Sequence, residues 1–235
     1  MKYTMDARVR YSETDMQEKL TLDAVLNYFQ DSAVFHSEDV GRGMNELKEK
    51  HLVWYLSSWQ ICIGEYPGVC EHIKVKTWPY AFHQMMGDRN HTIETEDGKV
   101  LIWGNSNWVL MDTEKQRPVP VPAALGENYG LEEKYPMEYA PRKIQIPRGG
   151  EKKEPLTITR AYLDSNQHVN NARYVQIAEE YIPENFPIRE LRAEYRRQAR
   201  KGDVFYPLVT EHEGEWIVSL DNAEGRPYAV VAFKA

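Results

Sequence analysis

The sequence predicts an α+β protein in which one helix wrapped by an antiparallel sheet occurs twice. Three observations support this prediction. The same order of strand and helix signals occurs in residues 1–122 and again in residues 155–235. A proline-rich connection, with a glycine pair near its end, joins the two halves over residues 123–154. When the halves are aligned without gaps, Asp15 falls on Asp164 and Leu26 on Val175, which indicates an internal duplication.

The first half is expected to contain a strand, a helix and four further strands. Strand-like residues 8–11 run on to Asp15. Thr21 is a good N-cap for a helix over residues 21–33. An apolar stripe at helical spacing follows it, formed by Leu22, Val25, Leu26, Phe29 and Ala33. Further along, the pattern predicts strands over residues 52–63, 71–80, 89–95 and 100–112, with a hairpin turn at 96–99.

The second half repeats this order in a shorter form. A strand over residues 156–160 leads to Asp164, and a helix over residues 170–181 follows. The pattern then predicts strands over residues 189–198, 203–212, 215–220 and 227–233, with a turn at 222–225 before the last strand.

Net charge, apolar runs and cysteine content argue against several classes of protein. The net charge of −7 and the isoelectric point of about 5.6 argue against a general nucleic-acid binder. No apolar run reaches membrane-spanning length, and the first residues lack the apolar core of a signal peptide. The two cysteines, Cys62 and Cys70, provide no disulfide framework. The sequence therefore predicts a cytoplasmic protein that does not insert into membranes.

A carboxylate, an amide and an imidazole recur at every second position in Asp164, Asn166 and His168. If this segment is extended, the three side chains point to one side. The helix that follows would offer unpaired N–H groups to a developing negative charge. These are the components of an acyl-transfer site. Where the second half has Ser165, Asn166 and His168, the first half has Met16, Gln17 and Lys19, so it keeps the aspartate but lacks the amide and the imidazole. The simpler interpretation is that both loops only cap the start of a helix, but the presence of the trio in one copy favours function.

Several motifs resemble one family. They are Arg10-Tyr-Ser-Glu-Thr-Asp15, Gly87-Asp-Arg89, Ser106-Asn-Trp-Val-Leu-Met-Asp112, Arg117-Pro-Val-Pro-Val-Pro122, Asp164-Ser-Asn-Gln-His-Val-Asn-Asn-Ala-Arg-Tyr174 and Glu194-Tyr-Arg-Arg197. Together they cover nearly the whole chain. The chain resembles the acyl-acyl carrier protein thioesterases of plants and bacteria, which consist of two tandem hotdog folds.

The resemblance implies hydrolysis of the thioester that joins a fatty acyl chain to acyl carrier protein. Free fatty acid is released and chain elongation ends. The resemblance implies no cofactor and no metal, and it maps the family's catalytic residues onto Asp164, Asn166 and His168. Many members have Glu-Cys directly after Glu-Tyr-Arg-Arg, whereas this chain has Gln198-Ala199. A cysteine nucleophile and a glutamate base are therefore excluded at these two positions.

Two mechanisms remain open from the sequence. In the first, His168 activates water, Asn166 orients the water or the carbonyl, and the N–H groups of Val169 and Asn170 stabilise the oxyanion. Asp164 then orients His168, and Gln198 positions the water. In the second, Asp164 itself is the nucleophile or the base.

The partner and the exact activity also leave alternatives. Basic side chains at Arg192, Arg196, Arg200 and Lys201 are candidates for docking the acidic carrier protein, although a solvated charged face explains them equally well. The alternative functions are an acyl-CoA thioesterase and a non-catalytic acyl-binding double hotdog, the latter suggested by Gln198. The sequence does not define the length or saturation of the acyl chain that the protein prefers. It also leaves the oligomeric state open, with a homodimer as one candidate.

Overall fold

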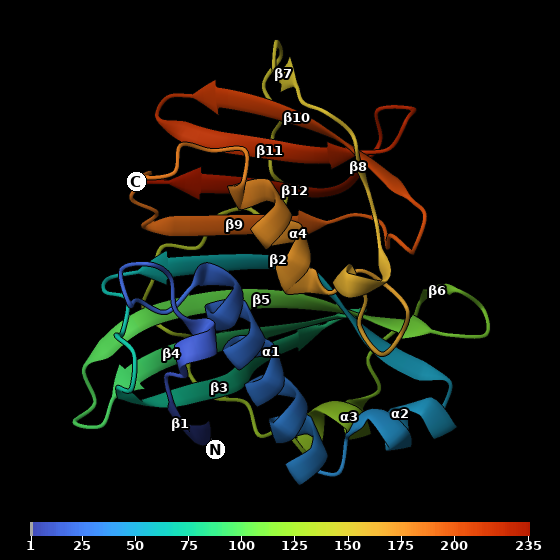
Figure 1. Ribbon diagram of the computed structural model, residues 1–235. Coiled ribbons are helices and arrows are strands. Elements are labelled where there is room, and N and C mark those ends of the chain that lie inside the picture. Colours follow the sequence, from blue (N-terminus) through green and yellow to red (C-terminus); the bar gives the residue numbers. More distant parts are fainter. Residues whose placement is uncertain (1) are drawn as a thin grey trace. The chain divides into compact units, whose positions relative to one another are not determined.

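The computed structural model describes residues 2–235, which form two compact units (Figure 1). The first unit comprises residues 2–57 and 63–139, and the second comprises Ser58–Cys62 and Ala140–Ala235. Each unit has one main helix against an antiparallel sheet, which is the α+β arrangement predicted from the sequence. Among the described residues, none of the helices combines the length and the apolar character needed to cross a bilayer.

Four neighbouring antiparallel strands build most of the first unit's sheet: β1 (Tyr3–Arg8), β3 (His72–His83), β4 (Met86–Thr95) and β5 (Val100–Asp112). Strand β2 (Leu52–Ile63) contributes its first residues here, and the short β6 (Arg117–Pro118) pairs with β5. The strand predicted at residues 8–11 is wrong in position, because β1 ends at Arg8 and Tyr11–Glu13 form a 3-10 turn. The Glu13 carboxylate accepts the backbone N–H of Arg10 at 3.0 Å, which stabilises this turn.

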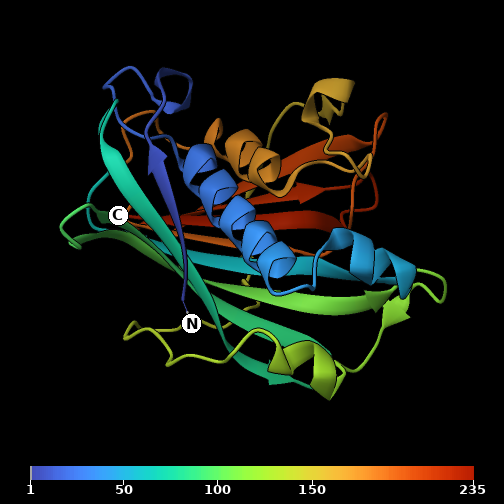
Figure 2. The ribbon, with the colours of Figure 1, turned by 90° about the horizontal axis from the view of Figure 1, so that it is seen from below.

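Helix α1 (Leu22–Asp39) lies across one face of this sheet (Figure 2). It begins directly after Thr21, as predicted, and it extends beyond residue 33 to Asp39. The predicted apolar stripe is confirmed, since each of its residues is at most 5% exposed. Burial of such a stripe stabilises an amphipathic helix far more than its intrinsic propensity does.

The opposite face of the sheet is covered by residues 132–139 (Figure 2), which follow α3 (Ala123–Glu127) along the chain. The indole N–H of Trp78 donates to the carbonyl of Glu133 at 2.8 Å. The Asn90 side-chain oxygen accepts the Tyr135 N–H and the Tyr139 hydroxyl, both at 3.0 Å. This part of the proline-rich segment is therefore packed on the sheet by specific hydrogen bonds.

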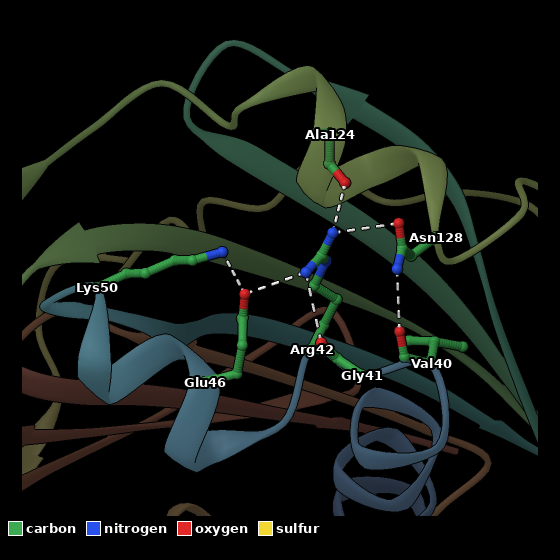
Figure 3. A network of polar contacts seen from close by, with 7 residues as sticks. All are labelled: Val40, Gly41, Arg42, Glu46, Lys50, Ala124 and Asn128. Carbon is green, nitrogen blue, oxygen red and sulfur yellow. Dashed lines mark hydrogen bonds and ion pairs between the residues drawn. The ribbon is translucent and has the colours of Figure 1, made fainter.

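A polar network centred on Arg42 joins the ends of three helices in the first unit (Figure 3). The Arg42 guanidinium donates to the Glu46 carboxylate on α2 (Met44–Glu49) at 3.0 Å. It also donates to the Ala124 carbonyl and the Asn128 side chain of the α3 region at 3.0 and 3.2 Å. The Asn128 amide returns a hydrogen bond to the Val40 carbonyl at the end of α1. This arginine thus has a carboxylate that compensates its charge.

The second unit repeats the design with a shorter helix, α4 (Asn171–Glu179). Its strands run in the spatial order β9 (Glu190–Tyr195), β12 (Pro227–Lys234), β11 (Glu215–Asp221), β10 (Val204–His212) and β7 (Glu151–Lys152), and Ser58–Cys62 of β2 pair with β9. The predicted strand at 156–160 is reduced to β8 (Leu156–Thr157), which is followed by a 3-10 turn at Arg160–Tyr162.

Strand β9 ends three residues earlier than the predicted boundary at 198. Its ladder is interrupted because the N–H groups of Arg196 and Arg197 both donate to the carbonyl of Tyr228. On the face of this sheet that Ile144 covers, Ile217, Val230 and Ala232 form a small apolar cluster. The Ile144 N–H donates to the Glu194 carboxylate at 2.9 Å, which holds the covering segment in place.

Candidate functional site

The segment that carries Asp164, Asn166 and His168 is a tight turn. The Asp164 N–H donates to the His168 carbonyl at 2.8 Å, and the Gln167 N–H donates to the Asp164 carbonyl at 3.1 Å. Gln167 has a φ of 62°, in the left-handed region, which lets the chain reverse. The expectation of an extended segment with alternating side chains is therefore wrong, because these local hydrogen bonds close the loop.

The Asp164 carboxylate is part of the turn. Its Oδ1 accepts the N–H groups of Asn166 and His168 at 2.8 and 3.2 Å. An aspartate that bonds the backbone a few residues ahead mimics a backbone turn and stabilises it. Asp164 therefore fixes the backbone of His168, and with it the point from which the imidazole extends.

The first unit contains the same turn at Asp15. The Asp15 N–H donates to the Lys19 carbonyl at 2.9 Å, and Oδ1 of Asp15 accepts the N–H groups of Gln17 and Lys19 at 2.9 Å. Glu18 has a φ of 59°, in the same region as Gln167. The aspartate is thus a structural element common to both repeats, whereas the imidazole is present in the second repeat alone.

His168 is the titratable group with the most exceptional surroundings in this loop. Its side chain is half-buried, and its Nε2 atom is buried without a hydrogen-bond partner among the described residues. Burial lowers the pKa of the imidazole, and the positive charge of Arg200 lowers it further, whereas Asp164 opposes the shift. A lowered pKa favours the neutral imidazole at pH 7, and a neutral imidazole has one ring nitrogen that can accept a proton.

A relay of hydrogen bonds connects this loop to helix α4 and to the residues after β9. The Val169 N–H donates to the Ala199 carbonyl at 2.9 Å, and the Ala199 N–H donates to the Tyr174 hydroxyl at 2.9 Å. The Asn170 N–H donates to the Tyr162 carbonyl at 2.9 Å. Val169 and Asn170 were expected to offer N–H groups to an oxyanion, but both groups are engaged within the protein in this conformation.

The remaining predicted site residues lie on the surface. The side chain of Asn166 is exposed beside the turn, and Gln198 is exposed beyond the end of β9. Gln198 precedes Ala199, whose carbonyl accepts the Val169 N–H, so the backbone at Gln198 is close to the His168 loop. Asn170 is the N-cap of α4, as its position directly before the helix suggests. Its side-chain oxygen accepts the Ala172 N–H at 2.8 Å.

The four candidate docking residues divide into two pairs. The Arg192 guanidinium donates to the Pro141 carbonyl at 2.6 Å, and the Arg196 guanidinium donates to the Glu194 carboxylate at 2.8 Å. Arg196 also donates to the Ile144 carbonyl at 3.2 Å, so both arginines hold the segment that covers the second unit's sheet. Arg200 and Lys201 have exposed side chains, and the charge of Arg200 acts on His168.

The influence of Arg200 gives a prediction for the titration of His168. Arg200→Gln removes the nearby positive charge, so the pKa of His168 is expected to rise from its lowered value. An NMR titration that follows the imidazole carbon-bound protons measures this shift. Arg197→Gln is the matched control, because Arg197 is also exposed but lies over the Tyr228 ring. Equal His168 titration curves for the wild type and Arg200→Gln would contradict the assigned cause.

Comparison with solved structures establishes the fold. A structure described as an acyl-ACP thioesterase from Bacteroides thetaiotaomicron superposes with a TM-score of 0.92 at 24% identity, covering 99% of this chain and 97% of that one. The 12:0-ACP thioesterase from Umbellularia californica superposes with a TM-score of 0.84 at 22% identity, covering 99% and 96%. The predicted hotdog fold is thereby confirmed.

Sequence comparison identifies the relatives. An oleoyl-acyl carrier protein thioesterase of Arabidopsis thaliana is 25% identical over 233 residues, which cover 90% of this chain and 63% of the relative. A dodecanoyl-[acyl-carrier-protein] hydrolase of Cinnamomum camphora is 26% identical over 230 residues, covering 88% and 58%. The chain thus spans about half to two thirds of the length of the curated relatives it matches.

Two family models match along the chain. The model of the acyl-ACP thioesterase N-terminal domain matches residues 1–129, and that of the C-terminal domain matches residues 148–223. The turn with Asp164 and His168 lies inside the second match. Because the two matches together cover well over half of the sequence, the chain belongs to the acyl-ACP thioesterase family.

Proposed function

We propose that this protein hydrolyses the thioester between a fatty acyl chain and acyl carrier protein, releasing free fatty acid and ending chain elongation. The observation that carries the proposal is the Nε2 atom of His168, which is buried, unpartnered among the described residues and kept neutral by burial and by Arg200. A neutral imidazole with an unoccupied acceptor suits a general base at neutral pH. Membership of the family supplies the reaction.

The proposed chemistry is a water attack assisted by His168. Because Nε2 is buried in the structure, the step requires the imidazole to turn toward the bound thioester. Nε2 then accepts a proton from water while the water oxygen bonds to the thioester carbonyl carbon. The resulting tetrahedral intermediate expels the thiolate, which then takes the proton from the imidazolium. A thiol with a pKa of about 8.5 leaves readily, so little acid assistance is required. The carboxylate of Asp164 favours the imidazolium electrostatically during the reaction.

The oxyanion partner is assigned to the Asn166 amide. The N–H groups of Val169 and Asn170 already donate to carbonyl groups of the protein, so binding an oxyanion there would first break a hydrogen bond. The Asn166 side chain is exposed at the same turn as His168 and carries two N–H donors. A donor aimed at the developing negative charge stabilises the transition state.

The direct test is thiol release from purified protein across acyl carrier protein substrates of increasing chain length, with the matching CoA thioesters in parallel. We expect turnover of the carrier protein substrates that exceeds turnover of the CoA substrates, and a preference for one chain length. Faster turnover of the CoA substrates would instead identify an acyl-CoA thioesterase.

Docking through Arg200 and Lys201 predicts that higher salt raises KM for the carrier protein substrates. A cytoplasmic location stays a prediction from composition.

Gln198, which stands where many members of the family have glutamate, suggests one alternative, a protein that binds acyl groups without hydrolysing them. Under our proposal Gln198 positions the attacking water through its amide. Gln198→Glu is then expected to retain activity with an altered pH profile. Gln198→Ala is expected to lower turnover about tenfold, since one hydrogen bond contributes about 1–1.5 kcal/mol. All three forms are compared on one acyl carrier protein substrate. An inactive wild type beside an active Gln198→Glu would favour the binding protein.

A further inference from the structure

Tyr174 on α4 is a buried tyrosine whose hydroxyl serves the chain segment after β9. The residue is 2% exposed, and its ring stacks on Phe205 at 5.5 Å and meets Tyr195 edge-on at 5.6 Å, measured between ring centroids. The hydroxyl oxygen accepts the N–H of Ala199 at 2.9 Å. Burial raises the pKa of Tyr174 above its usual value, so the hydroxyl stays protonated and neutral at pH 7. The packed ring therefore presents a neutral acceptor at a fixed position.

Ala199 depends on this acceptor because it lies beyond the ladder of the sheet. Strand β9 ends at Tyr195, and the next two N–H groups both donate to the carbonyl of Tyr228. Ala199 is fully buried, so its N–H needs an acceptor within the protein, since an unpaired buried N–H group is costly. The Tyr174 side chain supplies the acceptor that a neighbouring strand supplies within the sheet.

Ala199 in turn holds the backbone next to His168. Its carbonyl accepts the N–H of Val169 at 2.9 Å, and Val169 directly follows His168 in the chain. Tyr174 lies in the first turn of α4, which begins shortly after Val169. The two hydrogen bonds therefore close a ring that runs from Val169 along the chain to Tyr174 and returns through Ala199.

The first unit forms the equivalent turn without these two hydrogen bonds. In the ungapped alignment of the two halves, Val25 stands at the position of Tyr174. The N–H of Leu20, the counterpart of the Val169 N–H, donates to the Pro67 carbonyl at 2.9 Å. A proline has no N–H that needs an acceptor. The turn itself thus requires no tyrosine hydroxyl, and the hydroxyl occurs in the unit that carries the imidazole.

We infer that Tyr174 is a positioning residue for His168: its hydroxyl holds Ala199, and Ala199 holds the backbone from which the imidazole extends. This inference rests on the proposed role of His168 as the general base. Because the hydroxyl is buried and bonded to the protein, it acts through His168 rather than on the thioester. A misplacement of about 1 Å in a reacting group costs up to about 100-fold in rate. Arg200 directly follows Ala199, so the place of its charge beside His168 depends on the same hydroxyl.

Tyr174→Phe tests the inference, because phenylalanine keeps the ring and removes only the acceptor. We expect kcat for an acyl carrier protein substrate to fall about tenfold while KM changes by less than about twofold, since the hydroxyl positions the base and binds no substrate. Tyr195→Phe is the matched control. It removes a hydroxyl of the same aromatic cluster, which donates to the Asn171 carbonyl at 2.9 Å. It should leave kcat within about twofold of the wild type.

An NMR titration of His168 gives a readout that does not depend on hydrolysis. In the wild type, Arg200→Gln is expected to raise the pKa of His168, because it removes a nearby positive charge. In the Tyr174→Phe background, Arg200→Gln should raise this pKa by less, because the charge is no longer held at its place. Asp164, the other charged group that acts on the imidazole, is unchanged in both backgrounds.

Amide hydrogen exchange on the wild type keeps the inference testable if Tyr174→Phe does not fold. The N–H groups of Val169 and Ala199 should exchange slowly and with equal free energies of opening, because they open as one unit. Fast exchange at Ala199 would overturn the inference. So would an equal loss of kcat in Tyr174→Phe and Tyr195→Phe, or a folded Tyr174→Phe with the kcat and the His168 titration of the wild type. Absence of hydrolysis by the wild type would instead contradict the proposed function, and the exchange and titration results would still decide whether Tyr174 positions His168.

Discussion

His168→Ala is expected to lower turnover of an acyl carrier protein substrate by about 10²–10⁴-fold, the usual contribution of a positioned general base. The free energy of unfolding is expected to change little. The imidazole is half-buried, and its Nε2 atom has no hydrogen-bond partner in the described residues that the substitution would leave unpaired. The turn itself is held by backbone groups and by Asp164, which remain.

The duplication offers a matched control for this variant. Lys19 occupies the position in the first unit's turn that His168 occupies in the second, with the same backbone hydrogen bonds. Lys19→Ala should therefore leave turnover unchanged. Thiol release and chemical denaturation are measured on both variants. Turnover of His168→Ala within a few-fold of the wild type would exclude His168 as the base.

The fold could be predicted to a useful degree because its signals are local. The α1 stripe at Leu22, Val25, Leu26 and Phe29 follows helical periodicity, and the strands at residues 52–63 and 100–112 have the predicted bounds. Strand ends that depend on distant residues could not be found in this way. β9 stops at Tyr195 because two N–H groups turn to the carbonyl of Tyr228, far along the chain.

The same distinction between local signals and contacts of distant residues applies to the candidate site. Its residue types were visible in the sequence, but the reason given for their alignment was wrong. The side chains belong to a turn closed by Asp164, and nothing in the alternation of residues indicates that closure. Other features of the site join segments that are distant in the sequence. They are the hydrogen bond from the Val169 N–H to Ala199, the hydrogen bond from the Ala199 N–H to Tyr174, and the effect of the Arg200 charge on the pKa of His168. Only the repeated aspartate at Asp15 gave a sequence signal for the turn.

Asp164→Ala is expected to lower turnover by about 10²-fold or more, because loss of the turn displaces the base from its working position. Stability should also fall by about 1–2 kcal/mol, since two backbone N–H groups lose their acceptor. Asp15→Ala removes the equivalent bonds in the first unit. It should therefore reduce stability by a similar amount while turnover per folded molecule stays at the wild-type level.

Asp164→Asn separates the structural role of this residue from a chemical one. The asparagine side chain keeps an Oδ1 acceptor for the N–H groups of Asn166 and His168, so the turn and the stability should be retained. The negative charge that raises the pKa of His168 is lost, so that pKa should fall further and the acidic limb of the pH profile should move to lower pH. Turnover at neutral pH should stay within about tenfold of the wild type, because the weaker base still carries the reaction. If Asp164→Asn is instead as inactive as Asp164→Ala while remaining folded, Asp164 is the nucleophile or the base, and His168 acts beside it.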